Sequence, residues 1–379
     1  MRLLLIIIGL VALAMVGLWM EGIGILKDGT MRRLLLLVGG AITALVGLCG
    51  LALVMMMFWF GREEQPAYVW QVVTRSAAFL PDGRLAIAND KQTVIVSFPG
   101  YQTLRELPAG GYVASRPDGS VLAVAMRGAV KLFDPNSGAL IGQLDCWPPG
   151  EHIYEMHLSF SPDGRILAVA ESHHSRGPEV QFWDVSSQSQ IGTIRFDDPA
   201  ISVIQALAFS PTGHLVVSTH REGVWLVEVA QQAVIRNIQS WPSSYIAVSP
   251  DGSRLSLSEF ALVRTFDTRT WQVVHEQRFA QARPMADTWM SRLFSMPVAI
   301  SPDGNWLATP NREAPNDTFS LFESGPPRQT IALRRLADGR RVRVLSGSPR
   351  RLNQLLFSPD SRWLVDVGLS EIRVWRVEE

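Results

Sequence analysis

The amino-acid sequence predicts an all-β protein built from seven repeats of four strands each, closed into a ring. Three observations predict this fold: a recurring turn, the strand pattern around each copy, and strands at the two ends of the repeat region that complete each other. The clearest copy of the turn reads Ser161-Pro162-Asp163-Gly164. Successive copies lie 36 to 57 residues apart, a period typical of solenoids and β-propellers. The other copies are centred on Pro81, Pro117, Pro211, Pro250, Pro302 and Pro359.

Each turn lies between two stretches with the pattern of β-strands, and two more strands follow. In the third repeat, residues 155–161 and 166–170 flank the turn as strands a and b, and residues 179–185 and 191–196 form strands c and d. Proline presets the backbone angle at the first corner, and Gly164 supplies the left-handed angle that closes the hairpin. A four-stranded unit of this size cannot bury its apolar faces alone, so such repeats stack and close into a ring.

The two ends of the repeat region complete each other. The seventh repeat contains strands at residues 352–358, 362–367 and 371–378 but has no strand d. An additional strand, residues 68–73, precedes the first repeat. When this strand occupies the empty place, seven four-stranded blades close without a free strand edge, which would otherwise invite aggregation. We therefore expect residues 68–379 to form a seven-bladed β-propeller.

A short motif in strand c is typical of a known family. Phe182-Trp183-Asp184-Val185 follows its turn by the interval at which WD-repeat β-propellers carry a Trp-Asp pair. Arg373-Val374-Trp375-Arg376 is a weaker copy, because an arginine follows the tryptophan. The family also tends to carry a Gly-His pair before strand a, and only Glu151-His152 is similar to it. Residues 68–379 thus resemble a divergent, bacterial-type set of WD repeats, and the resemblance implies the same ring of blades.

Composition and charge argue against several classes of function. The chain has 379 residues, of which 47% are hydrophobic and 18% charged, below the ~25% usual for soluble domains. Its formal net charge is zero, which argues against a nucleic-acid binder that relies on bulk charge. Cys49 and Cys146 are its only cysteines, so we expect neither a disulfide framework nor a cysteine zinc site.

The first 61 residues are predicted to form a membrane anchor. Residues 3–20 and 34–60 are free of charged side chains, and each run reaches the ~18–20 residues that a helix needs to cross a bilayer. We expect a hairpin of two transmembrane α-helices, in contact with lipid over residues 3–60, and a polar linker over residues 62–67. Two alternatives stay open. The first run is cleaved as a signal peptide, or translation starts at Met31 and leaves a single anchor.

The distribution of basic residues predicts on which side of the membrane the propeller lies. Lys27, Arg32 and Arg33 lie between the apolar runs, whereas Arg2 and Arg62 flank them. The positive-inside rule places the connection in the cytoplasm and the propeller on the extracytoplasmic side, which we expect to be that of a bacterial inner or plasma membrane.

The sequence offers no convincing catalytic constellation. The strands expected to line the central channel contain no carboxylate, so we expect no metal ion there. His173 and His174 lie near Glu171 in a b–c connection, which we interpret as a solvated loop, with a weak surface metal site as the alternative. No nucleophile elbow and no phosphate-binding loop occur. We therefore expect no enzyme activity, cofactor or metal. The alternative is a propeller enzyme or small-molecule sensor, in which His152, His173, His174 and Glu171 converge.

The longest connections suggest where a partner binds. Residues 280–296 join repeats five and six, and residues 311–329 interrupt repeat six. In a propeller the d–a and b–c connections open on one face, and loops on a rigid scaffold commonly carry binding sites. Apolar residues at helical spacing within the first connection either pack on the propeller or form a partner surface. We therefore expect a membrane-anchored, non-catalytic scaffold that binds a protein partner through this face. The candidate partner-binding residues are Trp147, His173, His174, Met285, Trp289, Met290, Leu293 and Phe294.

Overall fold

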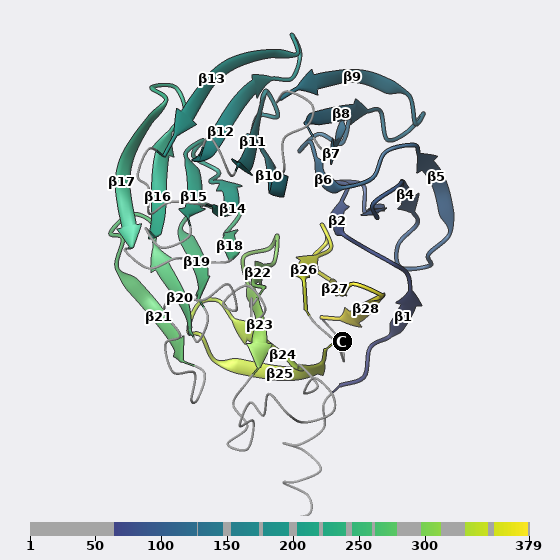
Figure 1. Ribbon diagram of the computed structural model, residues 1–379. Coiled ribbons are helices and arrows are strands. Elements are labelled where there is room, and N and C mark those ends of the chain that lie inside the picture. The colour runs from purple at the N-terminus through teal and green to yellow at the C-terminus, as the bar shows by residue number, and fades with distance from the viewer. Residues whose placement is uncertain are drawn as a thin grey trace, which may run out of the picture. The chain divides into compact units, whose positions relative to one another are not determined.

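The protein folds into a ring of seven four-stranded antiparallel sheets (Figure 1). The computed structural model describes residues 64–126, 128–146, 153–173, 177–196, 203–219, 223–239, 245–259, 262–278, 297–311, 330–347 and 352–377. From the inner to the outer strand, blade one contains β2 (Ser76–Phe79), β3 (Leu85–Ala88), β4 (Thr93–Val96) and β5 (Thr103–Leu107). Blade two contains β6 (Tyr112–Ser115), β7 (Leu122–Met126), β8 (Ala129–Phe133) and β9 (Leu140–Asp145). Blade three contains β10 (Ile153–Phe160), β11 (Ile166–His173), β12 (Gly177–Asp184) and β13 (Ser189–Arg195).

Blades four to seven repeat this arrangement and confirm the predicted fold. Again from inner to outer, blade four contains β14 (Ile204–Phe209), β15 (Leu215–Thr219), β16 (Gly223–Glu228) and β17 (Ala233–Gln239), and blade five contains β18 (Tyr245–Val248), β19 (Arg254–Glu259), β20 (Leu262–Asp267) and β21 (Val273–Arg278). Blade six contains β22 (Ala299–Ile300), β23 (Trp306–Asn311), β24 (Thr330–Arg335) and β25 (Arg341–Ser346). Blade seven contains β26 (Gln354–Phe357), β27 (Trp363–Val367), β28 (Glu371–Arg376) and β1 (Tyr68–Gln71).

The ring closes through β1, the strand that precedes the first repeat. It pairs antiparallel with β28, with Tyr68 opposite Val374 and Gln71 opposite Glu371. Blade seven therefore takes its outer strand from one end of the propeller region and its three inner strands from the other. The pairing that the strand count predicts is confirmed.

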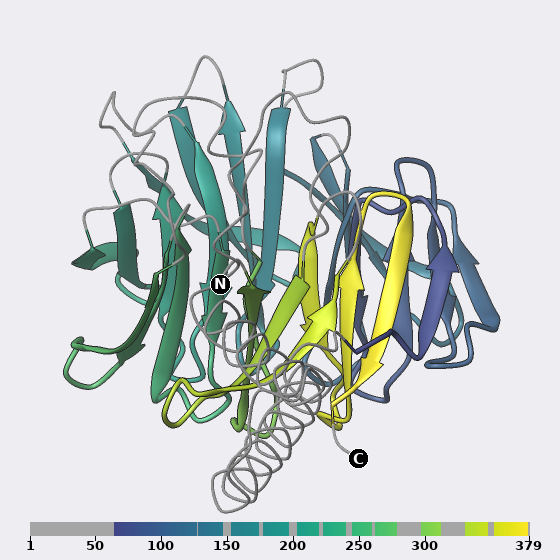
Figure 2. The ribbon, with the colours of Figure 1, turned by 90° about the horizontal axis from the view of Figure 1, so that it is seen from below.

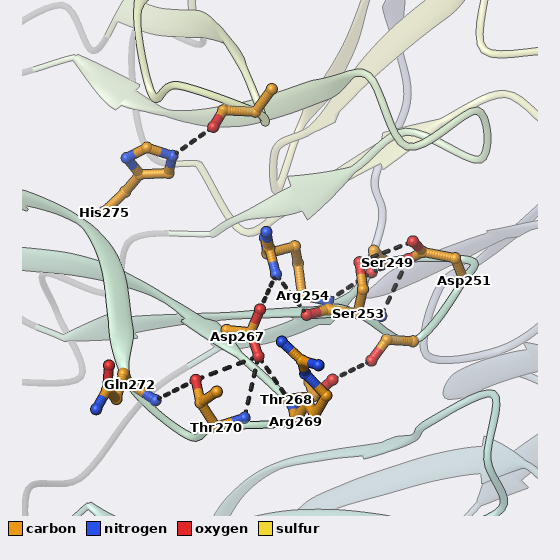
Figure 3. Close-up of polar contacts among 12 residues, drawn as sticks. Ser249, Asp251, Ser253, Arg254, Asp267, Thr268, Arg269, Thr270, Gln272 and His275 are labelled. Atoms are coloured by element: carbon orange, nitrogen blue, oxygen red, sulfur yellow. Dashed lines mark hydrogen bonds and ion pairs between the residues drawn. The ribbon is translucent and has the colours of Figure 1, made fainter.

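The recurring turn is held by its own side chains, which explains why serine and aspartate return in it. In blade three, the Ser161 hydroxyl donates to Asp163 over 2.6 Å and accepts from the backbone of Ile166 over 2.9 Å. Asp163 also accepts from the backbone of Arg165 over 3.0 Å, and Gly164 has a φ of +70°. Blade five builds the same turn with Ser249 and Asp251 (Figure 3). The turn is complete within six residues, so it needs no help from the rest of the fold.

The hydrophobic core lies in layers between neighbouring blades. Leu132 and Leu144 of blade two pack in one layer with Phe160 and Leu167 of blade three. Successive residues of a strand point to opposite faces, so each inner strand supplies apolar side chains to two layers. This is why the second strand of a blade reads as an unbroken apolar run, as in Leu85–Ala88.

The propeller has two unlike faces, which we name for the connections they carry. The loop face carries the d–a and b–c connections, and the turn face carries the a–b and c–d turns. Figure 2 views the ring from the side, with strands running from one face to the other.

The chain enters the described structure beside the end of β28 that leads to the turn face. Glu64 forms a parallel bridge with Leu345 of blade six, and its carbonyl accepts a hydrogen bond from the Trp375 indole over 3.3 Å. Its carboxylate forms an ion pair with Arg343, which also donates to the Val377 carbonyl over 2.5 Å. Glu64 belongs to the expected linker at residues 62–67, yet it is fastened between blades six and seven.

Both predicted transmembrane runs, residues 3–20 and 34–60, lie outside the described residues. Within the parts of residues 64–377 that the structure describes, no helix is long and apolar enough to span a membrane.

Candidate functional site

The central channel opens on the loop face into a cavity of about 760 Å³. All seven blades contribute to its wall, from Ser76 in blade one to Leu355 in blade seven. The inner strands meet it with their first residues, which lie at the loop-face end. A cavity of this size falls in the range of ordinary ligand sites, and it is the place where the blades converge.

One side of the cavity mouth is polar and charged. Arg75 forms an ion pair with Asp90, and their side chains are 44% and 72% exposed. The Arg75 guanidinium also lies 5.5 Å from the centroid of the Tyr112 ring and donates to its hydroxyl over 3.4 Å. The hydrogen bond to Asp90 is the largest influence that raises the pKa of Arg75. Exposed pairs add little to stability, so this cluster is more valuable as a contact surface than as a support for the fold.

Glycine positions the acidic half of this cluster. A side chain at Gly110 would place its Cβ 2.2 Å from the Asn89 carbonyl oxygen, so only glycine fits. The neighbouring Gly111 has a φ of +132° and donates its backbone N–H to the same carbonyl over 2.8 Å. The Asn89 side chain accepts from the backbone of Lys91 and Gln92. The b–c turn of blade one is thereby fixed against Gly110 and Gly111, which precede β6 of blade two, and Asp90 is held at the mouth.

An apolar lip lies on the cavity beside the charged cluster. Val73 and Leu369 both line the cavity, and they are 68% and 54% exposed. Thr74 joins the two segments: its hydroxyl donates to the Gly368 carbonyl over 2.7 Å, and its backbone N–H donates to the Leu369 carbonyl over 3.1 Å. We use the name apolar lip for Val73 and Leu369. These side chains are exposed although the backbone around them is firmly held.

Hydrogen bonds across blade seams brace the rest of the wall. The Gln354 side chain accepts from the Ala77 backbone N–H over 3.2 Å and donates to the Ala77 carbonyl over 3.0 Å, which ties blade seven to blade one. The Tyr245 hydroxyl of blade five donates to the Asn353 carbonyl of blade seven over 2.5 Å and so reaches past blade six. These hydrogen bonds connect blades one, five and seven at the cavity wall.

Most of the candidate residues from the sequence lie outside the described residues. His173 is the last residue of β11, opposite Gly177 of β12. Glu171 is fully buried in the same strand, opposite Glu179. The convergence of these residues with His152, required by the enzyme alternative, stays a prediction. The candidates outside the described residues are Trp147, His174, Met285, Trp289, Met290, Leu293 and Phe294.

The cavity mouth is built mainly from residues that sequence reasoning passed over. Val73, Arg75, Asp90 and Leu369 lie in connections, whereas the search for channel residues considered the inner strands alone. The sequence analysis concerned carboxylates in the inner strands, whereas Asp90 at the mouth comes from a b–c turn. The glycine pair that ends at Gly111 was the available signal, since adjacent glycines mark a close backbone approach.

The described side chains provide no evident nucleophile or metal site. Among the described residues, no three His, Cys, Asp or Glu side chains lie close enough to hold a metal ion. Burial raises the pKa of the Cys146 thiol, so the thiolate is disfavoured. In blade three, Glu179 accepts from Arg195 over 3.1 Å and from Gln181 over 2.9 Å, and Gln181 accepts from the Trp183 indole. Gln181 also donates to the Cys146 carbonyl over 2.9 Å, so the network fastens blade three internally and to blade two.

Comparison with known proteins shows the fold alone. No family model matches the chain. The chain is similar to one in a crystal structure described as that of the mitotic checkpoint complex, with a TM-score of 0.64 and 14% sequence identity. The similarity covers 84% of this chain and 94% of that one. Together with the seven closed sheets, the comparison establishes the fold as a seven-bladed β-propeller.

Proposed function

We propose that the protein is a membrane-anchored, non-catalytic scaffold that binds a protein partner through its loop face. One observation carries the proposal: the cavity mouth places the exposed apolar lip, Val73 and Leu369, directly beside the cluster of Arg75, Asp90 and Tyr112. Interface cores combine apolar contact with aromatic and arginine side chains, and this mouth offers all three on a wall braced by hydrogen bonds between blades. We infer a partner segment that places an apolar side chain in the cavity and a polar group against the charged cluster.

The anchor follows from the apolar runs at residues 3–20 and 34–60. The chain joins the propeller at Glu64, next to Trp375 and Val377 at the end of β28. The basic connection between the apolar runs favours an extracytoplasmic propeller.

Photo-crosslinking tests the proposed binding face in the full-length, membrane-bound protein. A photoreactive residue replaces Leu369, 54% exposed on the lip, or Leu140, 55% exposed on the outer wall of blade two, as the matched control. We expect a discrete protein adduct from position 369 alone, which disappears on adding Val73→Asp. Equal adducts from both positions, or none from position 369, would contradict the proposal.

A second candidate is a small-molecule sensor, because a cavity of about 760 Å³ also suits a compact ligand. Native mass spectrometry of the purified full-length protein distinguishes the two functions. A bound small molecule that Leu356→Trp expels from the cavity wall would favour the sensor. A protein without such a molecule that still forms the crosslink from position 369 would favour the scaffold.

A further inference from the structure

Exposed apolar side chains gather in two places on the described propeller. Apart from Val73 and Leu369 at the cavity mouth, every exposed large apolar side chain lies within the first three residues of an outer strand. Examples are Leu140, Ile235 and Val342, in blades two, four and six, and exposure across the group runs from 36% to 55%. In six blades the first residues of the outer strand follow the c–d turn, and in blade seven Tyr68 of β1 lies opposite Val374 near the end of β28. These side chains therefore form an apolar belt at the turn-face end of the wall.

The remainder of the outer wall is polar. Toward the loop face, the outer strands carry Glu106, Asp145, Arg195, Glu276 and Arg278. The wall is thus divided along the channel axis into an apolar end and a charged end. Single apolar residues scattered over a surface need no explanation. Here, however, all seven blades expose apolar side chains at the same end, so the turn-face end of the outer wall is apolar all around the ring.

One sector of this belt adjoins the point where the chain enters the propeller. Tyr68 and Val69 of β1 are 41% and 46% exposed, and Val342 of β25 is 45% exposed. These strands belong to blades seven and six, between which Glu64 is fastened. Tyrosine combines an apolar ring with a polar hydroxyl and is enriched at membrane interfaces.

The same sector carries exposed basic side chains. Arg340 lies in the c–d turn of blade six and Arg376 at the end of β28, and both are exposed. Two described acidic groups of the sector are engaged: Asp338 lies 3.7 Å from Arg335, and the Asp360 carboxylate accepts from the Ser358 hydroxyl. Arginines close to an anionic bilayer surface attract it, each by about fivefold in the binding equilibrium.

The short tether holds this sector close to any membrane that the apolar run enters. Residue 60 ends the run, and Glu64 is already part of the propeller. Four steps along an extended chain span about 14 Å. A tether of this length gives a high effective concentration for contact between the sector and the lipid surface.

We propose that the outer wall at the junction of blades six and seven docks on an anionic bilayer surface. Tyr68, Val69 and Val342 contact the headgroup and acyl boundary, and Arg340 and Arg376 face the anionic headgroups. This inference rests on the proposed membrane anchor and goes beyond it, because it gives the anchored propeller a preferred orientation. The other five blades carry the same belt without the tether and so supply controls.

The test uses the full chain reconstituted in vesicles of phosphatidylcholine, with or without phosphatidylglycerol. A lipid-sensitive fluorophore is placed through Val342→Cys or, as the matched control, Ile235→Cys on blade four, both in a Cys49→Ser background. Burial raises the pKa of the Cys146 thiol, so that cysteine stays unlabelled in the folded protein. Quenching by lipid-attached nitroxides reports contact with the bilayer, and flotation after alkaline carbonate extraction reports anchoring separately.

We expect nitroxide quenching at position 342 and little at position 235, with stronger quenching when phosphatidylglycerol is present. The double variant Arg340→Ser, Arg376→Ser is expected to float normally, because its anchor is unchanged. It should no longer be quenched more strongly when phosphatidylglycerol is present, because each arginine contributes about fivefold to binding of the anionic surface. Equal quenching at positions 342 and 235 in protein that still floats overturns the docking proposal alone. Protein that does not float overturns the anchor and the docking proposal together.

Discussion

The turn face and the loop face of the propeller differ in how their polar groups are used. On the turn face the serine and aspartate of the recurring turn bond to each other, as Ser249 and Asp251 do in blade five (Figure 3). On the loop face the charged side chains Arg75 and Asp90 remain substantially exposed at an open cavity. The comparison teaches that one repeated unit supports two tasks. The regular face shapes the blades, and the irregular face is available for binding.

Replacement of the tryptophan beside the chain entry tests how strongly this end of the ring is held. Trp375 is 1% exposed, and its indole donates to Glu64. We expect Trp375→Ala to lower the free energy of unfolding by about 3–5 kcal/mol, because it opens a large cavity at the closing blade. Trp375→Phe keeps most of the packing and should cost about 1–2 kcal/mol. Denaturant unfolding measures both, and equal losses would contradict a packing role.

Glycine replacements on the two faces should differ in size. Gly110→Ala on the loop face forces a Cβ against the Asn89 carbonyl, and we expect a loss of about 3 kcal/mol. Gly304→Ala on the turn face meets no atom within 4 Å and must tolerate only its φ of +73°, at about 1–2 kcal/mol. Thermal and denaturant unfolding compare the two variants. A larger loss at Gly304 would show that the mouth frame is soft.

Acid should weaken the turn face. Hydrogen bonds lower the pKa of Asp184, Asp251 and Asp267 from the ordinary 3.8 to about 2. The unfolded chain therefore takes up protons first, so the stabilisation is complete above pH 3.8 and is lost as the pH falls toward 2. Urea unfolding across this interval should show a declining free energy. Asp251→Asn should flatten the decline, and an unchanged slope would count against the assignment.

The smallest effect on stability is expected at the cavity mouth. Arg75→Met removes an exposed ion pair with Asp90, so the free energy of unfolding should change by no more than about 1 kcal/mol. The same variant should weaken the crosslink formed from position 369. A stable variant with undiminished crosslinking would remove the charged cluster from the proposed interface.

The two faces also differ in how well the sequence predicts them. The turns and most strands follow the predicted positions, as β13 (Ser189–Arg195) follows the strand predicted at residues 191–196, because their determinants are local: alternation, proline, aspartate and glycine. The mouth was not predicted, because its side chains come from connections with no shared pattern. The sequence also predicts the partner strand of β28. The seventh repeat lacks its fourth strand, and the additional strand before the first repeat, residues 68–73, can take that place.

By itself, the sequence determined the number of blades, the nature of their turns and the strand that closes the ring. Each of these depends on interactions within a few residues or on counting repeated units. Tertiary structure alone decided which side chains meet at the cavity. Val73 and Leu369 are separated by most of the propeller in sequence, and Thr74 joins their segments only once β1 has paired with β28. The physical reason is that closure of the ring, a long-range event, creates the mouth.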